Sequence, residues 1–386
     1  MKHAASIVSL VRRIAFFAVF AASLAQATPL DLKVMTQNMF FGTDLAPLAT
    51  ATPATLPFIV AAGFAEVVAS NPAGRIARIA DEIAAAQPHI VGLQEAVTLA
   101  TRTPSLLTGF PGPEVVAFDF LPMLLGELAA RGQSYTAVAV GTGINLAAPG
   151  FDPFTMPVLT DVRFTDREAI LVRTDLPLDE FKVLAAGAPT FAATLPVTVG
   201  GVTVQIPHTY PFVDVQMGDI RFRAVTTHLE PTFPPVQVAQ SLELISFLNG
   251  ASYPQIALGD FNSRADGSTT ASYGNMLAAG FKDTWLEKGI GPGFTCCQAE
   301  DLLNIPSLLS ERVDFVFHRD GFRTLGIDLL GEEPGDRIAT GQWPSDHAGL
   351  LATLAVVPEP GTMLLLVISL GALTLTRRRP VLPALV

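Results

Sequence analysis

The amino-acid sequence predicts an α/β fold, in which buried strands alternate along the chain with helices that cover them. One observation is a set of short apolar runs, such as Ile90–Leu93 and Ile256–Leu258, that suit strands buried on both faces. Another is the spacing of Ile76, Ile79 and Ile83, which places apolar side chains on one face of a helix. Alternating strands and helices are typical of α/β proteins.

The first predicted elements form a strand–helix–strand unit. Residues 32–36 alternate like a strand, which ends at Asn38. The helix that follows stops at Pro88, because proline cannot continue a helix. The buried strand 90–93 comes next and ends in Glu95. Each strand of this unit therefore delivers a polar side chain at its end.

A second unit of the same kind follows later in the chain. Apolar residues alternate with arginines over 220–224, which predicts a strand that ends at His228. Residues Val236–Leu248 predict a helix, and the strand in the stretch QIALGDFN ends in Asp260. A polar side chain again stands at the end of each strand.

The next predicted strand contains a carboxylate. Val313, Phe315 and Phe317 share one face of this strand, so Asp314 points the opposite way, alongside Val316. A carboxylate beside an apolar neighbour is expected to be partly buried, and a buried charge needs a partner. Asp314 is therefore a candidate site residue.

Residues that bind metals or move protons stand at the ends of these strands or beside them. They are Asn38, Glu95, His228, Asp260 with Asn262, and Asp346 with His347, which precede a last apolar run at Leu350–Val357. A surface turn would also explain Asp260 and Asn262. Five such junctions in one chain instead predict an active site, because such sites gather on loops held by a rigid scaffold.

At this point the motifs resemble a known family. In order, TQNMF, VGLQEA, DREAILVR, TTHLE, GDFNS, RVDFVF and SDHAG resemble the endonuclease/exonuclease/phosphatase superfamily of deoxyribonuclease-like, metal-dependent phosphoesterases. The resemblance runs from about Leu32 to Val356. It implies a four-layer α/β sandwich, in which two packed β-sheets are flanked by helices. We expect one such domain over residues 28–357.

The resemblance also implies a metal site. Glu95 would be the principal Mg²⁺ ligand, assisted by Asn38, with Asp346 on the metal side of the site. Carboxylate and amide oxygens suit Mg²⁺, and also Mn²⁺ or Ca²⁺. Such a cation would act mainly as a Lewis acid and a template.

The catalytic roles come from the same resemblance. Asp260 and Asn262 would orient the attacking water and hold a phosphate oxygen. His347 would contact the scissile phosphate, with Asp314 as its carboxylate partner. Whether Asp260 or His347 removes the proton of the water stays open.

A second histidine would protonate the leaving oxygen, and His228 matches it. Its acidic partner would be Asp166 or Glu168, which share one face of the DREAILVR strand. An ungapped comparison of that strand favours Asp166. The other histidines of the domain match no motif and are expected to be structural or at the surface: His89, His208 and His318.

The chain has two cysteines, Cys296 and Cys297, and they are adjacent. An exported protein could oxidise them, although neighbouring cysteines form only a small-ring disulfide. Two thiolates without a nearby pair of histidines make a zinc site unexpected. We expect a local structural role, such as a vicinal disulfide.

The N-terminus predicts export. Basic residues precede an apolar run at Ile14–Leu24 and an A-x-A site at Ala25–Ala27, which together are typical of a signal peptide covering residues 1–27. The run is shorter than the roughly 20 residues that span a bilayer, which argues against the alternative of an N-terminal anchor.

The C-terminal segment 358–386 resembles the PEP-CTERM sorting tag of Gram-negative bacteria. Its features are Pro-Glu-Pro at 358–360, an apolar run at Thr362–Leu375 and three arginines at 377–379. This resemblance implies processing by an exosortase, a tail transiently in the inner membrane, and delivery to the cell surface or extracellular matrix. The alternative is a plain transmembrane helix with cytoplasmic arginines.

Charge bears on the substrate. Six of the 24 basic residues and one of the 35 acidic residues lie outside 28–357, which leaves that segment with a net charge of −16. A broad basic face for nucleic acid is therefore not expected, while a clustered acidic metal site remains compatible with this charge. The expected activity is hydrolysis of a phosphodiester in DNA, RNA or a phospholipid headgroup, by a monomer. A different class remains open: a catalytically silent surface or matrix binding protein on the same fold.

Several segments depart from compact nucleases of the family. Three of them are apolar and are expected to be loops: Ala46–Pro72, Thr101–Pro122 and Thr142–Thr160. The composition of Ala185–Val215, rich in Thr, Val and Gly, predicts an extra β-hairpin. Apolar loops near the site could enter a lipid surface. The favoured alternative is that they pack on the core or against each other.

Overall fold

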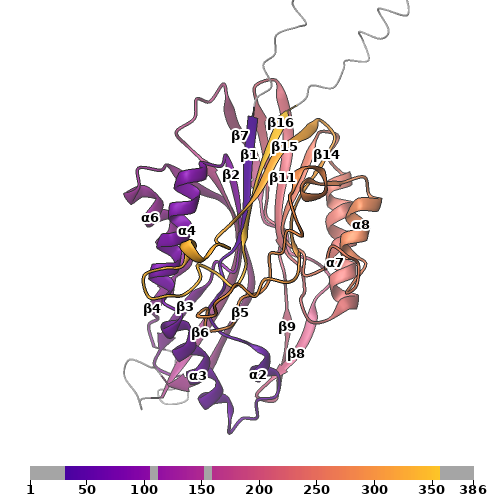
Figure 1. Cartoon of the computed structure of the whole chain (residues 1–386). Helices are drawn as coiled ribbons and strands as arrows, with labels where there is room; N and C mark the ends of the chain where they lie inside the picture. The colour runs from indigo at the N-terminus through magenta and orange to yellow at the C-terminus, as the bar shows by residue number, and fades with distance from the viewer. Residues whose placement is uncertain (1–30, 105–111, 152–158, 357–386) are drawn as a thin grey trace, which may run out of the picture.

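The computed structural model describes residues 31–104, 112–151 and 159–356. The predicted signal peptide 1–27 and sorting segment 358–386 lie outside the described residues, so both stay predictions. In the described part of the chain, two large sheets pack face to face with helices on their outer faces (Figure 1). The predicted α/β sandwich is confirmed.

The first sheet contains eight strands, in the order β15-β16-β1-β2-β6-β3-β4, with β5 also paired to β6. Their bounds are β1 Asp31–Asn38, β2 Ile90–Gln94, β3 Thr98–Arg102, β4 Val115–Asp119, β5 Tyr135–Phe151, β6 Leu159–Arg173, β15 Phe322–Leu330 and β16 Gly349–Val356. The central strands β1 and β2 are parallel, as their strand–helix–strand connection requires.

The second sheet contains six strands, in the order β13-β14-β12-β11-β10-β7. Their bounds are β7 Phe181–Gly187, β10 Phe212–Met217, β11 Ile220–His228, β12 Gln255–Asp260, β13 Lys282–Asp283 and β14 Asp314–Arg319. Here β11 and β12 form the parallel pair. The predicted extra hairpin is also present, formed by β8 Leu195–Val199 and β9 Val202–Ile206.

Helices cover the outer faces of both sheets. The helices are α2 Ala46–Ala49, α3 Leu56–Ala69, α4 Pro72–Ala86, α6 Phe120–Ala130, α7 Pro234–Asn249, α8 Ser272–Ala278 and α9 Thr284–Lys288, with a 3₁₀ turn at Pro334–Asp336. Figure 1 shows α4 and α6 beside the first sheet and α7 and α8 beside the second. The predicted helices around Ile76–Ile83 and Val236–Leu248 correspond to α4 and α7.

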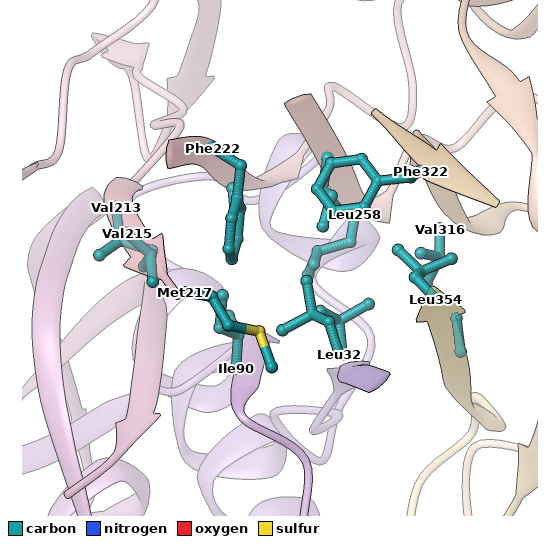
Figure 2. Close-up of a cluster of buried hydrophobic side chains, with 14 of the residues drawn as sticks. Leu32, Ile90, Val213, Val215, Met217, Phe222, Leu258, Val316, Phe322 and Leu354 are labelled. Carbon is teal, nitrogen blue, oxygen red and sulfur yellow. The ribbon is translucent and has the colours of Figure 1, made fainter. Parts of the chain in front are cut away.

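Three apolar cores match these layers. One lies between the sheets, where Leu32, Phe222 and Leu258 are buried together (Figure 2). A second joins the first sheet to its helices, and a third joins the second sheet to α7 and α8. Along β14, Val316 belongs to the core between the sheets while Phe315 belongs to the helix side, so the predicted alternation is confirmed.

The apolar segments predicted as loops are mostly regular structure, so that prediction was wrong. Ala46–Pro72 forms α2 and α3, because Leu56, Phe64 and Val67 bury their side chains there. Residues 142–151 continue β5, since pairing with β6 satisfies their backbone groups. These segments therefore pack on the rest of the domain, which was the favoured alternative.

Among the described residues, no single helix is long and apolar enough to cross a membrane. The helices α3 and α4 pass that test only as a pair, bent by 47° at their break. Both contribute buried side chains to the core beside the first sheet.

Gly259, directly before Asp260, is the position where the backbone of the second sheet tolerates no side chain. Its φ is +135°, and an added Cβ would overlap the carbonyl oxygen of Thr227 on β11. We expect Gly259→Ala to lower the free energy of unfolding by about 2 kcal/mol or more, because strain and overlap add. Urea denaturation measures this change.

The matched control is Gly126→Ala in α6, where an added Cβ meets no atom within 4 Å. Alanine there should be neutral or stabilise by about 0.5–1 kcal/mol, because glycine disfavours helix interiors. Equal effects of the two substitutions would contradict the proposed constraint at Gly259.

Candidate active site

Strand pairing brings the polar strand ends together. In the first sheet Asn38 is in register with Gln94, the residue before Glu95. In the second sheet Asp260 is in register with His228 on one side and Asp314 on the other. Because the two sheets face each other, these strand ends form one site at their junction.

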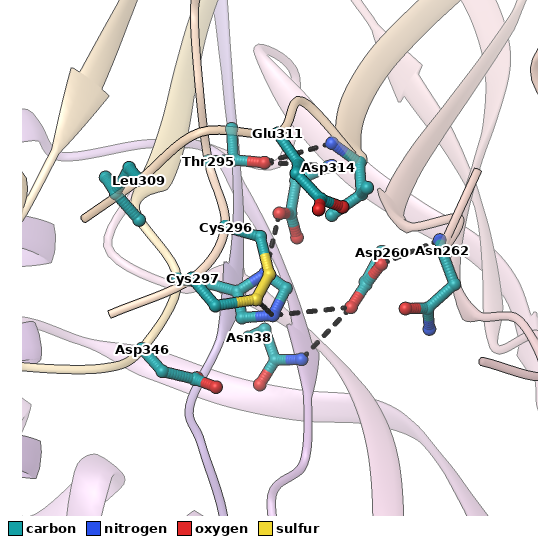
Figure 3. The surroundings of a disulfide bond; sticks show 12 residues. Asn38, Asp260, Asn262, Thr295, Cys296, Cys297, Leu309, Glu311, Asp314 and Asp346 are labelled. Carbon is teal, nitrogen blue, oxygen red and sulfur yellow. Dashed lines mark hydrogen bonds and ion pairs between the residues drawn. A yellow bond between two sulfur atoms is a disulfide. The ribbon is translucent and has the colours of Figure 1, made fainter. Parts of the chain in front are cut away.

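Asn38 bridges the two sheets. Its Nδ2 donates to Glu95 Oε1 at 3.0 Å and to Asp260 Oδ2 at 3.3 Å, while its Oδ1 accepts from the backbone N–H of Phe40 at 2.9 Å. Figure 3 shows the Asn38 amide directed at Asp260. In this arrangement Asn38 is a hydrogen-bond donor to two carboxylates, and its role as a metal ligand stays a prediction.

Glu95 lies buried directly after β2, with a φ of +55°. Its Oε2 accepts from the backbone N–H of Phe41 at 2.8 Å. Burial raises the pKa of Glu95 well above its ordinary value, and the charges of Asp346 and Asp166 raise it further. A carboxylate in this position needs a positive partner to stay ionised.

Asp260 lies between the two predicted histidines. Its Oδ2 is 3.5 Å from His228 Nε2 and 3.8 Å from His347 Nε2. Its Oδ1 accepts from the backbone N–H of Asn262 at 2.8 Å. The Asn262 side chain donates to Leu229 O at 2.9 Å, which leaves its own oxygen as an acceptor.

His347 and Asp314 form the predicted pair, with 2.8 Å between Nδ1 and Oδ2. Burial alone would lower the pKa of His347, but the charges of Asp314, Asp346 and Asp260 and the bond to Asp314 raise it well above its ordinary value. With Nδ1 bound to Asp314, Nε2 is the ring nitrogen that faces Asp260.

The surroundings of His228 differ from those of His347. Ligand atoms of His228, Asp166 and Glu168 lie within 4.8 Å of one another, and all three side chains are buried. Glu168 accepts a hydrogen bond from Thr209, whereas His228 Nδ1 has no hydrogen-bond partner among the described residues. Burial lowers the pKa of His228, and the charges of Asp260 and Asp166 only partly offset this.

The pKa of His347 is therefore raised and that of His228 is lowered, although both rings lie beside Asp260. Protonation of a leaving oxygen by His228 stays a prediction, as does its pairing with Asp166 or Glu168. Both carboxylates are close enough to contribute. Burial raises the pKa of Asp166, and burial together with the neighbouring Asp166 raises the pKa of Glu168.

Arg75 is a positioning residue that sequence reasoning missed. This fully buried side chain of α4 donates to the carbonyl oxygens of Met39 at 2.8 Å, Phe40 at 3.0 Å and Pro344 at 3.2 Å. It thereby ties the segment after β1 to the segment before the SDH motif. The available signal was an arginine four residues before Ile79, on the apolar face of a predicted helix.

His208 was expected to be structural or at the surface, and it is buried beside the site. Its Nε2 lies 3.2 Å from Glu230 Oε2, and its ring packs edge-on against the ring of His228 at 6.0 Å. Burial alone would raise the pKa of Glu230, but its bonds to His208 and Thr232 lower it to about 2. No motif in the sequence marked this pair.

The two cysteines form the predicted vicinal disulfide. One histidine lies near them, since Cys297 Sγ is 3.9 Å from His347 Nε2, whereas nothing in the sequence predicted one there. Strand pairing across the sheet brings these distant residues together: Cys296 forms isolated bridges with both His347 and Glu311. Figure 3 shows the disulfide beside Asp260, Asp314 and Asp346.

The chemistry of this site fits a hard divalent cation. The ligand atoms of Asp260, Asp314 and His347 lie within 4.8 Å of one another, and Asp314 Oδ1 is buried without a hydrogen-bond partner among the described residues. Burial raises the pKa values of Glu95 and Asp346. A cation on these oxygens would offset both the burial and the mutual repulsion.

The fold and the site together define a class of protein. A two-sheet sandwich with acidic and histidine clusters at the junction of its sheets is a phosphoesterase fold. The profile of the Endonuclease/Exonuclease/phosphatase family matches residues 35–347, so the chain belongs to this family. No curated protein is similar enough in sequence to be matched with this chain.

Solved structures support the fold. Family proteins from Bacteroides vulgatus and Bacteroides thetaiotaomicron are each 17% identical, with TM-scores of 0.50 and 0.51 over 85% of this chain and 99% and 96% of theirs. One from Leptotrichia buccalis is 16% identical, with a TM-score of 0.50 over 84% of this chain and 99% of its own. At this identity the similarity shows the fold alone.

The His347–Asp314 pair gives a direct test of the site. We expect His347→Ala and Asp314→Asn each to lower kcat for a small phosphoester by about 10²–10⁴-fold, because the first variant lacks the imidazole and in the second the imidazole loses its carboxylate partner. The double variant should be little worse than the more damaged single variant, since the two residues act as a unit.

The control is His318→Gln, which removes a different buried histidine, located on β14. His318 Nε2 also contacts a carboxylate, that of Glu287 at 2.8 Å. This variant should keep kcat within about twofold if it folds, because the side chain does not contact the site. Wild-type kcat in His347→Ala would refute the assignment.

Proposed function

We propose that this protein is a secreted, divalent-metal-dependent phosphoesterase that hydrolyses phosphodiester bonds. The observation that carries the proposal is the His347–Asp314 pair, placed beside Asp260 and Glu95 at the junction of the two sheets. Such a pair has a role wherever a proton must be held and oriented. Its neighbours supply the oxygen ligands that a phosphate-binding cation requires.

Different residues would have different roles in the reaction. In hydrolysis, water attacks phosphorus, one P–O ester bond breaks, and the leaving oxygen takes up a proton. His347 Nε2 can donate to a phosphate oxygen, because Nδ1 is already held by Asp314. Asp260 can accept a hydrogen bond from the attacking water, and the Asn262 amide is placed beside it.

The cofactor we propose is Mg²⁺, with Mn²⁺ or Ca²⁺ as substitutes. Glu95 would hold it, with Asn38 and Asp346 nearby. When bound, such a cation neutralises phosphate charge and polarises a phosphoryl oxygen. Arg75 supports the same site, because it holds the backbone at Met39 and at Pro344.

The substrate class is a phosphodiester in DNA, RNA or a phospholipid headgroup. The net charge of −16 over 28–357 provides no broad attraction for a polyanion. The α2–α3 segment and the β8–β9 hairpin touch each other, because Gly200 at the hairpin tip lies against the side chain of Leu56. They still expose apolar side chains, among them Phe58 and Val202, which supports including lipids in a screen.

Export is part of the same proposal and rests on the sequence of the two ends. Residues 1–27 would direct secretion, and 358–386 would be recognised by an exosortase after a transient stay in the inner membrane. The domain would then act at the cell surface or in the extracellular matrix of a Gram-negative bacterium. We propose that it acts there as a monomer.

The test is hydrolysis of bis-p-nitrophenyl phosphate by the purified full-length protein, with Mg²⁺ and then with EDTA. We expect turnover that EDTA abolishes and that added Mg²⁺ restores. In Glu95→Gln the Mg²⁺ concentration for half-maximal rate should rise by about tenfold or more, because a metal ligand is lost. DNA, RNA and sphingomyelin are then compared as natural substrates.

The control is Glu127→Gln, which changes an exposed glutamate of α6 that pairs with Arg131. Its metal response should match that of the wild type, because surface ion pairs contribute little. A folded protein with no turnover in any divalent metal, on any of these substrates, would favour the silent binding protein instead.

A further inference from the structure

The vicinal disulfide lies at the catalytic histidine, and this placement has a chemical consequence. Ligand atoms of Cys296, Cys297 and His347 lie within 4.8 Å of one another. Sulfur and imidazole nitrogen are soft ligands that select ions such as Zn²⁺ over Mg²⁺. The oxidised pair cannot supply thiolates, whereas the reduced pair can.

We propose that reduction of the Cys296–Cys297 disulfide creates a site for a soft divalent cation such as Zn²⁺, formed by both sulfurs and His347, and that its occupation silences the enzyme. Only the loss of activity rests on the function proposed above. The redox state of the two cysteines would thereby select which class of metal the active site holds.

The distances are compatible with one shared ion. In tetrahedral zinc sites the Zn–S bond is about 2.3 Å and the Zn–N bond about 2.0–2.1 Å. A sulfur and a nitrogen bound to the same zinc are therefore about 3.5 Å apart. Cys297 Sγ and His347 Nε2 are 3.9 Å apart.

The backbone holds the cysteines in place independently of the disulfide. Cys296 N donates to Glu311 O at 2.9 Å, and Gln298 N donates to Asp346 O at 2.9 Å. These bonds need no sulfur atom, so reduction leaves the two side chains next to the SDH motif. Cys297 is exposed, which gives reductants and metal ions access to the pair.

The redox step balances with a dithiol reductant. The S–S bond of the protein breaks and its two sulfurs take up two electrons and two protons, while the reductant forms its own disulfide. Binding of Zn²⁺ then releases the two thiol protons and the proton of His347 Nε2. His347 Nε2 becomes a ligand, so it can no longer donate to a phosphate oxygen.

Cellular compartments would set this switch. The cytosol keeps thiols reduced, while exported proteins meet an oxidising environment. Combined with the proposed export, the enzyme would be silent where it is made and active where it is delivered. A nuclease or lipase-like phosphodiesterase would gain by such a restriction, since its substrates are also present in the cytosol.

The experiment counts Zn²⁺ on the full-length protein in its oxidised state and after reduction with a phosphine, with excess Mg²⁺ present to fill hard-oxygen sites. A chromogenic chelator reports bound zinc without using activity. We expect one additional tightly bound Zn²⁺ per reduced molecule. Cys297→Ser and, for binding only, His347→Ala should weaken that ion by about 100-fold or more, because each removes a ligand.

Turnover of bis-p-nitrophenyl phosphate is measured on the same samples. Zn²⁺ should lower the rate of the reduced wild type by more than tenfold and leave the oxidised protein unaffected. Reoxidation after chelation should restore the rate. The Cys296→Ser/Cys297→Ser double variant, checked for folding by circular dichroism, should resist the same Zn²⁺ concentration.

Equal zinc content of the oxidised and reduced wild type would overturn the inference, and this comparison needs no variant. Additional zinc that leaves turnover unchanged would overturn the role of His347 in the site. If no state shows turnover, the proposed phosphodiesterase fails, and the zinc count with its dependence on Cys297 and His347 still decides whether the soft-metal site exists.

Discussion

The structure depends on how it accommodates buried carboxylates that repel one another at the junction of its two sheets. Burial raises the pKa values of Glu95, Asp166 and Asp346, and neighbouring charges act on each of them. Isolated, such groups would take up protons instead of staying ionised. At Asp346 the charges of His347 and Arg75 oppose the effect of burial on its pKa. Burial lowers the pKa of Arg75 to about 10, partly offset by Asp346 and Glu95. The divalent cation proposed above would complete this balance.

The backbone is built to bring these groups close. At Gly92 an added Cβ would overlap Leu258 and Thr226, so the sheets approach there without room for a side chain. Close to that contact, Gln94 on β2 donates to Thr226 Oγ1 on β11 at 2.8 Å, which joins the sheets directly before Glu95. The site is therefore the place where the two layers are held in register. The sheets fix the strand ends, and Arg75 fixes the segment after β1 and the segment before the SDH motif.

Strand ends could be predicted from sequence because each apolar run stops abruptly at a polar residue. That pattern pointed to Glu95 and Asp260, while the alternation of apolar residues within a strand pointed to Asp314. The partner of a given side chain was harder to predict, because pairing across two sheets is a long-range property. His208 carries no local signal of its place, and the neighbour of Cys297 is fifty residues away in sequence. For Arg75 the only signal was its position on the apolar face of a predicted helix. The apolar segments were predicted as loops because composition alone does not show what will pack against them.

The most direct test of the account is the position of a bound metal. Crystals soaked in Mn²⁺ and measured at the manganese absorption edge should show an anomalous peak within about 2.0–2.3 Å of a Glu95 carboxylate oxygen, among the side chains at the junction of the sheets. A peak there would establish that the clustered carboxylates exist to hold a hard cation. No peak in that space at saturating Mn²⁺, or peaks confined to acidic groups on the outer surface, would contradict the account.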